Sequence, residues 1–153
     1  MVKSLSQVLL AIGPNDRTHV DELLDTVEAV AGPADATVFL LHVFEREEYN
    51  DLMSEMSLDA TVNTVQPDEL ATRHENVQTP AARLEEAGID FEIRGTVGQP
   101  DTEVVRVAED IGVDLLFIGG GGQTPTKKAI FGDDAQQILL KAPCPVTYVQ
   151  RRS

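Results

Sequence analysis

LLFIGGGG, residues 115–122, decides the fold. Its first half is a continuous apolar run, typical of a strand buried on both faces of a parallel sheet. Its second half opens a loop from Gly119 to Gly132 that contains five of the eleven glycines of the chain. Consecutive glycines cost backbone entropy, so they indicate backbone that approaches a ligand closely or adopts positive φ. A helical pattern follows from about Asp133 to Leu140.

The rest of the chain alternates strand and helix patterns in the same way. Strands are expected at residues 7–12, 36–44, 91–95, 115–119 and 146–149. Helices are expected from about Thr18 to Val30, from Pro67 to about Ala87, from Pro100, and from about Asp133. Helix-breaking residues interrupt two of these helical patterns. Gly32-Pro33 should end the first helix, and Pro80 should kink or restart the second. Residues 45–66 have weak periodicity and are expected to form a mobile excursion.

This alternation predicts an α/β fold: one domain over residues 1–153, with an open parallel sheet covered by helices on both faces. In such sheets, ligands bind beyond the carboxyl ends of the strands, where the winding direction reverses. The two loops expected to matter are therefore Gly13 to Asn15, after the first strand, and Gly119 to Gly132.

The formal charge of −14 opposes binding to nucleic acid or an anionic membrane, since both need positive charge on the protein. No stretch reaches the roughly 18 apolar residues of a membrane span. We therefore expect a cytoplasmic protein, without nucleic-acid or membrane partners. Arginine outnumbers lysine eight to four, and this balance suits a high-salt cytoplasm.

The glycine loop lies between a buried strand and a short helix, where backbone N–H groups and a helix N-terminus bind phosphate. It is not a Walker loop, because no Gly-Lys-Ser/Thr triplet follows the first glycines. It also lacks the compact dinucleotide fingerprint.

The spacing of three glycines resembles the motif of nucleotide-binding members of the universal stress protein family. Gly119 and Gly122 form a Gly-x-x-Gly pair, and Gly132 follows after nine intervening residues. The resemblance extends over nearly the whole chain, from QVLLAIGPND at residues 7–16 to APCPVTYV at 142–149. It implies a Rossmann-like sheet of five parallel strands in the order 3-2-1-4-5, as in adenine nucleotide alpha hydrolases. It also implies a homodimer that pairs through the last strand, Val146 to Val149.

The same resemblance implies a site for ATP or another adenine nucleotide, with Val43 contacting adenine through its backbone. The residues expected to contribute are Gly13, Pro14, Asn15, Val43, Gly119, Gly122, Lys127, Gly132, Asp133 and Asp134. Two of them depart from the family pattern. Gly13 replaces an Asp that helps to bind adenosine, and Asp133 replaces a Ser or Thr that contacts phosphate. Asp133 places a carboxylate where the phosphate would lie, although Lys127 or a bridging Mg²⁺ could offset its charge.

No catalytic residues are predicted, and any enzymatic activity should be at most weak ATP hydrolysis. His42 is expected to be a buried structural histidine with a satisfied hydrogen bond, and His74 to lie on a helix in polar company. No cluster has zinc-ligand spacing, so no metal site is expected. Cys144 lies in an apolar context that favours packing over reactivity.

Three functions remain open. The first is a stress-response or regulatory protein that binds an adenine nucleotide. The second is an interaction module of the same fold that has lost nucleotide and acts on a protein partner through its dimer and the 45–66 segment. The third, which the family resemblance allows, is an enzyme that acts on ATP.

Overall fold

The computed structural model describes residues 5–12, 20–56, 66–120 and 133–150. They form one five-stranded sheet in the order β3-β2-β1-β4-β5, in which all strand pairs are parallel. The strands are β1 (Gln7–Ala11), β2 (Thr37–Phe44), β3 (Phe91–Val97), β4 (Leu115–Gly120) and β5 (Val146–Gln150). The predicted fold class and strand order are confirmed.

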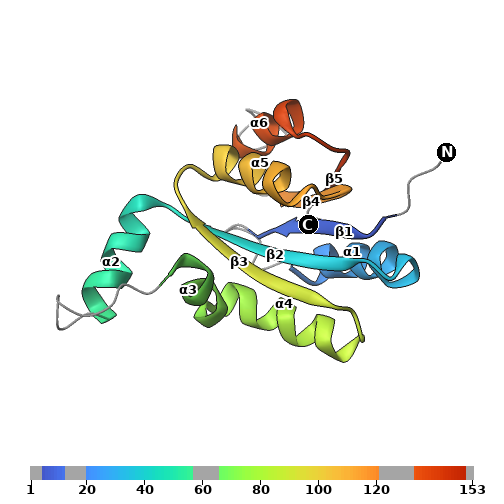
Figure 1. Ribbon diagram of the computed structural model, residues 1–153, viewed down its shortest axis with the longest axis horizontal. Helices are drawn as coiled ribbons and strands as arrows, with labels where there is room; N and C mark the ends of the chain where they lie inside the picture. The colour runs from blue at the N-terminus through green and yellow to red at the C-terminus, as the bar shows by residue number, and fades with distance from the viewer. Residues whose placement is uncertain (1–4, 13–19, 57–65, 121–132, 151–153) are drawn as a thin grey trace.

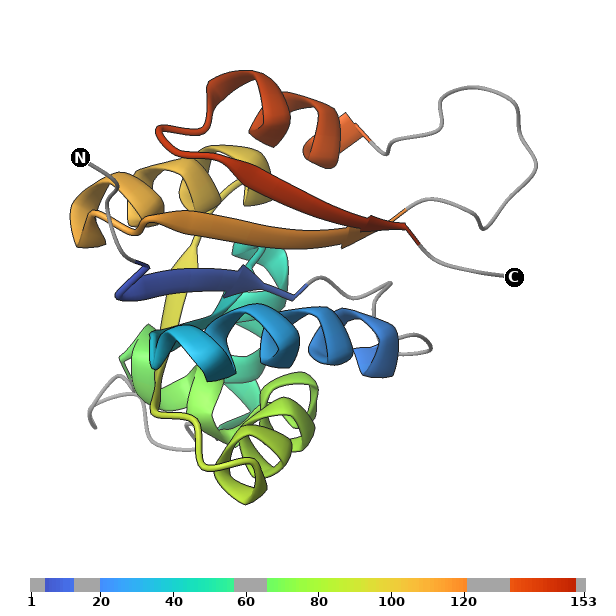
Figure 2. The same ribbon diagram turned by 90° about the vertical axis from the view of Figure 1, so that its right-hand side faces the viewer.

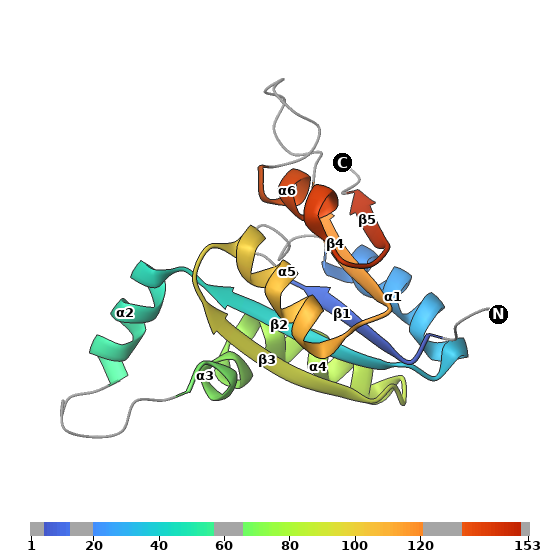
Figure 3. The same ribbon diagram turned by 45° about the horizontal axis from the view of Figure 1, so that its top comes forward.

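Helices cover both faces of this sheet (Figure 2). One face carries α5 (Pro100–Ile111) and α6 (Asp133–Lys141), and the other carries α1 (Val20–Ala34) and α4 (Glu75–Glu86). The short helix α3 (Pro67–Arg73) packs against the edge strand β3, whereas α2 (Arg46–Met56) projects beyond the carboxyl end of β2 (Figures 1 and 3). None of the described helices is long and apolar enough to cross a membrane.

The core lies on both sides of the sheet because successive side chains of a strand point to opposite faces. Val38 and Leu40 of β2 belong to a buried cluster with residues of α1 and α4. Phe39 and Leu41 belong to a second cluster with residues of α5 and α6. The middle strands are therefore buried on both faces, which explains their continuous apolar runs.

Helix α1 continues through Gly32 and Pro33, so the predicted stop is wrong. Pro33 lies in the last turn, where its missing N–H removes a single backbone hydrogen bond. The helix ends instead at Asp35, which has a φ of 57°. There the N–H of Ala36 donates to the carbonyl of Ala31 and that of Asp35 to the carbonyl of Gly32, each at 3.1 Å, which is a Schellman motif. An aspartate occupies the left-handed position that glycine usually marks.

The first half of the 45–66 segment, which the sequence predicts to be a mobile excursion, forms helix α2. Most residues of this helix are charged or polar, and only three apolar side chains recur on its packed face. The apolar periodicity in the sequence is therefore weak. These three, Tyr49, Leu52 and Met53, pack against a small buried cluster formed by Phe44, Leu70 and Ala71. Residues 57–65 lie outside the described part of the chain.

The predicted helix from Pro67 to Ala87 is divided at His74 and not at Pro80. Pro80 lies inside α4, where its missing N–H weakens the helix. Its ring is buried against the core, and this packing offsets the loss. The break comes at His74, which is extended with φ −78° and ψ 133° and accepts a hydrogen bond from the backbone N–H of Asn76. Gly88, with a φ of 74°, ends the helix as expected.

Candidate functional site

The loops predicted to bind a nucleotide leave the same edge of the sheet. β1 and β4 are adjacent and parallel, with Leu10 opposite Phe117, so the chain leaves both strands at neighbouring positions. Gly119 lies near the end of β4 opposite Val149 of β5. Helix α6 begins at Asp133, and its N-terminus carries the positive end of the helix dipole.

The structure describes only part of the predicted nucleotide site. Val43 and Gly119 are described fully, whereas Asp133 and Asp134 are described only as the backbone of the first turn of α6. Six predicted residues lie outside the described ranges: Gly13, Pro14, Asn15, Gly122, Lys127 and Gly132.

The backbone of Val43 points toward the end of β1. Along β2, residues with odd numbers direct their backbone groups toward β1. Thr37 donates to the carbonyl of Ser6, and the carbonyl of Leu41 accepts from the N–H of Ile12. The register between the two strands ends at Ala11 opposite Leu41, whereas β2 continues to Phe44. The N–H and carbonyl of Val43 therefore both face the region just beyond the last residue of β1.

A pocket of about 170 Å³ lies on the α1/α4 face, beside the end of β1. It is smaller than the 300–1,000 Å³ typical of ligand sites, so the described residues alone do not enclose a nucleotide. The pocket is lined by Ile12, Val20, Glu75, Asn76, Thr79 and Pro80.

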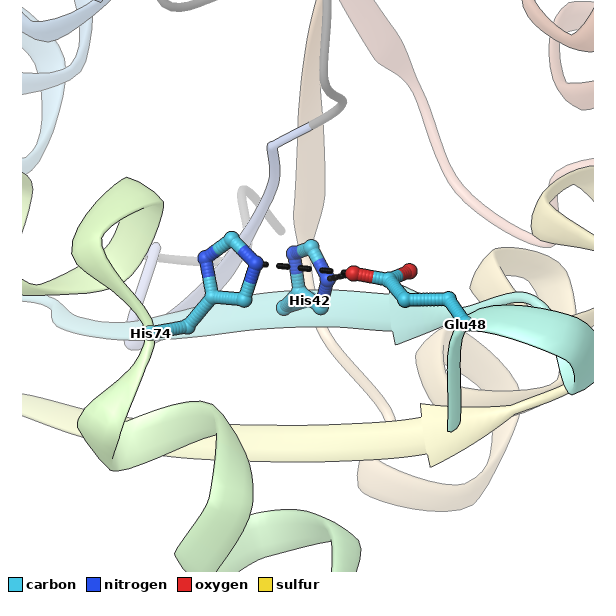
Figure 4. Close-up of side chains that lie close together, drawn as sticks. All are labelled: His42, Glu48 and His74. Atoms are coloured by element: carbon cyan, nitrogen blue, oxygen red, sulfur yellow. Dashed lines mark ion pairs between the residues drawn. The ribbon is translucent and has the colours of Figure 1, made fainter. Parts of the chain in front are cut away.

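Next to this pocket, the fold brings together His42, Glu48 and His74 from three different elements (Figure 4). His42 lies on β2, Glu48 in the first turn of α2, and His74 at the junction of α3 and α4. The two imidazole rings are stacked with their centroids 4.1 Å apart. Glu48 directs its carboxylate at both rings, with Oε2 3.5 Å from Nε2 of His42 and 3.5 Å from Nε2 of His74.

His42 is buried as predicted, with 3% of its surface exposed, but the expected hydrogen bond is missing. Neither ring nitrogen has a hydrogen-bond partner among the described residues. Burial, followed by the electrostatic effect of the neighbouring His74, lowers the pKa of His42 from 6.5 to about 4, although Glu48 opposes this shift. His42 is therefore neutral at physiological pH.

The sequence does not predict this cluster, because residues so far apart in the chain show no ligand spacing. The helical position expected for His74 is also wrong, since this residue precedes the first turn of α4 and caps it. The one available signal is a histidine near the end of a buried strand, where loops from other elements converge.

Cys144 packs against the α5/α6 cluster, in agreement with its apolar context. Burial, followed by the charge of Asp114, raises the pKa of its thiol. The thiolate, which is the nucleophilic form, is therefore disfavoured at neutral pH.

Comparison with known proteins agrees with this architecture. The universal stress protein MJ0577 from Methanocaldococcus jannaschii is 27% identical over 92% of this chain and 93% of its own length. The solved structure of MJ0577 superposes with a TM-score of 0.73 at 24% identity, covering 99% of both chains.

Two further solved structures have the same fold and contain nucleotides. A universal stress protein in complex with cAMP has a TM-score of 0.66 at 16% identity, over 98% of this chain and 100% of that one. A universal stress protein from Archaeoglobus fulgidus in complex with dAMP has a TM-score of 0.65 at 16% identity, over 96% and 99%. The model of the universal stress protein family itself matches residues 5–150. The chain therefore belongs to the universal stress protein family.

Proposed function

We propose that this chain is a small cytoplasmic stress-response or regulatory protein that binds ATP or another adenine nucleotide without turning it over. The site lies at the carboxyl edge of the sheet, between the ends of β1 and β4 and the start of α6. The complexes of family members with cAMP and dAMP support an adenine ligand.

The observation that carries this proposal is the orientation of Val43 beside the adjacent ends of β1 and β4. Its backbone offers one donor and one acceptor toward the region where the winding direction reverses, which is where open α/β sheets bind their ligands. The proposed adenine contact is thus with backbone and does not depend on the identity of the side chain.

Asp133 is the main obstacle to phosphate binding at this edge. Two like charges about 4 Å apart oppose each other by ~1 kcal/mol in bulk water and by ~4 kcal/mol at an effective dielectric constant of 20. A carboxylate at this distance from a phosphate would therefore lower nucleotide affinity by about one to three decades, unless Mg²⁺ bridges the two groups.

Calorimetric titration of the purified protein with ATP, AMP and cAMP, with and without Mg²⁺, tests the proposal. Mass spectrometry of ligands released by denaturation identifies any nucleotide that copurifies. The variant Asp133→Ser should bind ATP about 10-fold or more tightly than the parent protein in the absence of Mg²⁺. Glu109→Gln, which removes one exposed charge from α5, is the matched control and should leave the affinity unchanged.

Binding without release of ADP supports the proposed function. Absence of binding up to millimolar nucleotide, in both the parent protein and Asp133→Ser, contradicts it. That result would favour the interaction module instead, with the projecting helix α2 as its contact element.

We also propose that the protein is a homodimer that pairs through β5. This strand is an edge of the described sheet, so its outer backbone groups can pair with a second copy. Light scattering should give twice the chain mass of 16.6 kDa. A monomer mass at all concentrations contradicts the dimer and leaves the nucleotide proposal untouched.

A further inference from the structure

The cluster of His42, Glu48 and His74 has ligand atoms at the spacing of a metal site. One ligand atom from each side chain lies within 4.8 Å of the other two. The carboxylate oxygen is 3.5 Å from each Nε2, which is long for an N–H···O hydrogen bond of about 2.9–3.0 Å. Around a tetrahedral Zn²⁺ with bonds of about 2.0–2.2 Å, neighbouring ligand atoms are separated by about 3.3–3.5 Å. The two carboxylate–imidazole separations are therefore close to those between neighbouring ligands of a zinc ion.

His42 provides a second and independent indication. It is almost completely buried and faces the cluster, and neither ring nitrogen has a hydrogen-bond partner among the described residues. Buried polar groups are normally satisfied, so an unpartnered imidazole needs an explanation.

We propose that His42, Glu48 and His74 bind a divalent transition-metal ion, with Zn²⁺ as the best match. The ligands are Nε2 of each histidine and Oε2 of Glu48, and a fourth position is left for water or another ligand. Two imidazoles and one carboxylate are a recurrent zinc ligand set. The carboxylate offsets half of the charge of the ion, and the net charge of −14 of the chain favours a cation at long range.

Coordination through His74 requires a change in the cap of helix α4. Nδ1 of His74 accepts a hydrogen bond from the N–H of Asn76 at 3.1 Å, so the proton of the neutral ring is on Nε2. To bind metal, the ring must transfer this proton to Nδ1, and the cap bond is then lost. Loss of a cap lowers the affinity by roughly 2- to 30-fold. The stacked rings must also turn, because a metal ion lies near the plane of the imidazole that binds it.

The test is titration of the tag-free, nucleotide-free protein with Zn²⁺ by calorimetry, and with Co²⁺ by visible absorption. One ion should bind per chain, and Co²⁺ should give the absorption bands of a tetrahedral site. Glu48→Gln and His74→Asn should each weaken Zn²⁺ binding by about 10-fold or more. Asparagine is a good N-cap residue, so His74→Asn removes the ligand while keeping a cap for α4.

Glu47→Gln is the matched control. It removes the same charge from the same turn of α2, but at an exposed position outside the cluster, so it should bind Zn²⁺ like the parent protein. Faster amide exchange at Asn76 in the Zn²⁺ complex would show that His74 has given up the cap. The proposal is wrong if the parent protein binds no Zn²⁺ at a concentration of about 100 μM. Equal Zn²⁺ affinity in Glu48→Gln, His74→Asn and Glu47→Gln would also refute it.

Discussion

Gly95 allows helix α3 to lie directly against the edge strand β3, and its replacement by alanine is a severe test of this packing. A Cβ at this position would lie 2.1 Å from the carbonyl oxygen of Pro67 and 2.6 Å from its carbonyl carbon. The N–H of Gly95 also donates to Oδ1 of Asp68 at 2.7 Å, which satisfies a backbone donor on the outer side of β3. Alanine cannot be accommodated unless the two backbones separate by roughly 1 Å, because 3.4 Å is the lower end of ordinary contact.

The expected cost of Gly95→Ala combines two effects. Overpacking costs about 1–3 kcal/mol, and a hydrogen bond to a charged group contributes about 1.5–3 kcal/mol when it is lost. Alanine is about 0.5–1 kcal/mol better than glycine in a strand, which offsets part of the loss. We therefore expect Gly95→Ala to lower the free energy of unfolding by about 3 kcal/mol. This is a large part of the 5–15 kcal/mol typical of a domain.

Urea denaturation followed by circular dichroism measures this change, with Gly112→Ala as the control. Gly112 has a φ of 76°, and a Cβ at this position would have no other atom within 4 Å, so alanine there should cost only the left-handed conformation, about 1–2 kcal/mol. Since α3 leads to His74, Gly95→Ala should also weaken Zn²⁺ binding, whereas Gly112→Ala should not. If Gly95→Ala costs no more than Gly112→Ala, the proposed close packing of α3 on β3 is wrong.

Two further predictions concern charge. The pKa of His42 is lowered to about 4 in the folded protein, so between pH 6.5 and about 4 this histidine is protonated in the unfolded chain but not in the folded one. In metal-free buffer, the parent protein should therefore lose roughly 3 kcal/mol of stability as pH falls through this range. Urea denaturation should show a smaller loss for His42→Gln, and equal losses in the two proteins would contradict the shift. Arg83 on α4 contacts Asp21, Asp25 and Glu28 on α1, so Arg83→Gln should destabilise the fold by about 1–2 kcal/mol at low salt and by less in 1 M NaCl. The same loss at both salt concentrations would mean that the network contributes through packing and not through charge.

The sheet could be predicted from the sequence because its strands are buried on both faces and stand out as short apolar runs. The run at residues 115–119, followed by glycines, indicates both a strand and the edge where a ligand site is expected. Helix boundaries were less accurate, because their causes are tertiary. Pro80 is tolerated inside α4 because its ring is buried, and α1 ends at Asp35 although the sequence offers glycine and proline before it.

The two candidate sites also differ in how far the sequence predicts them. Residues of the nucleotide motif are close in the chain, so their spacing suggests them, and Val43 follows from the family resemblance. His42, Glu48 and His74 become neighbours only because α2 and α3 both pack at the end of β2. No local pattern records this arrangement, since it depends on how three elements meet.

The unequal lengths of β1 and β2 have a consequence for base selectivity. Val43 presents an N–H and a carbonyl side by side beyond the end of β1. Adenine has an acceptor, N1, next to a donor, the amino group on C6, so its edge can pair with a peptide group of this kind. Guanine has a donor at N1 next to an acceptor at O6, and the same approach would oppose donor to donor and acceptor to acceptor. In the proposed adenine site, this peptide group would discriminate between purines without any specificity-determining side chain, and substitution of Val43 by another apolar residue would preserve that discrimination.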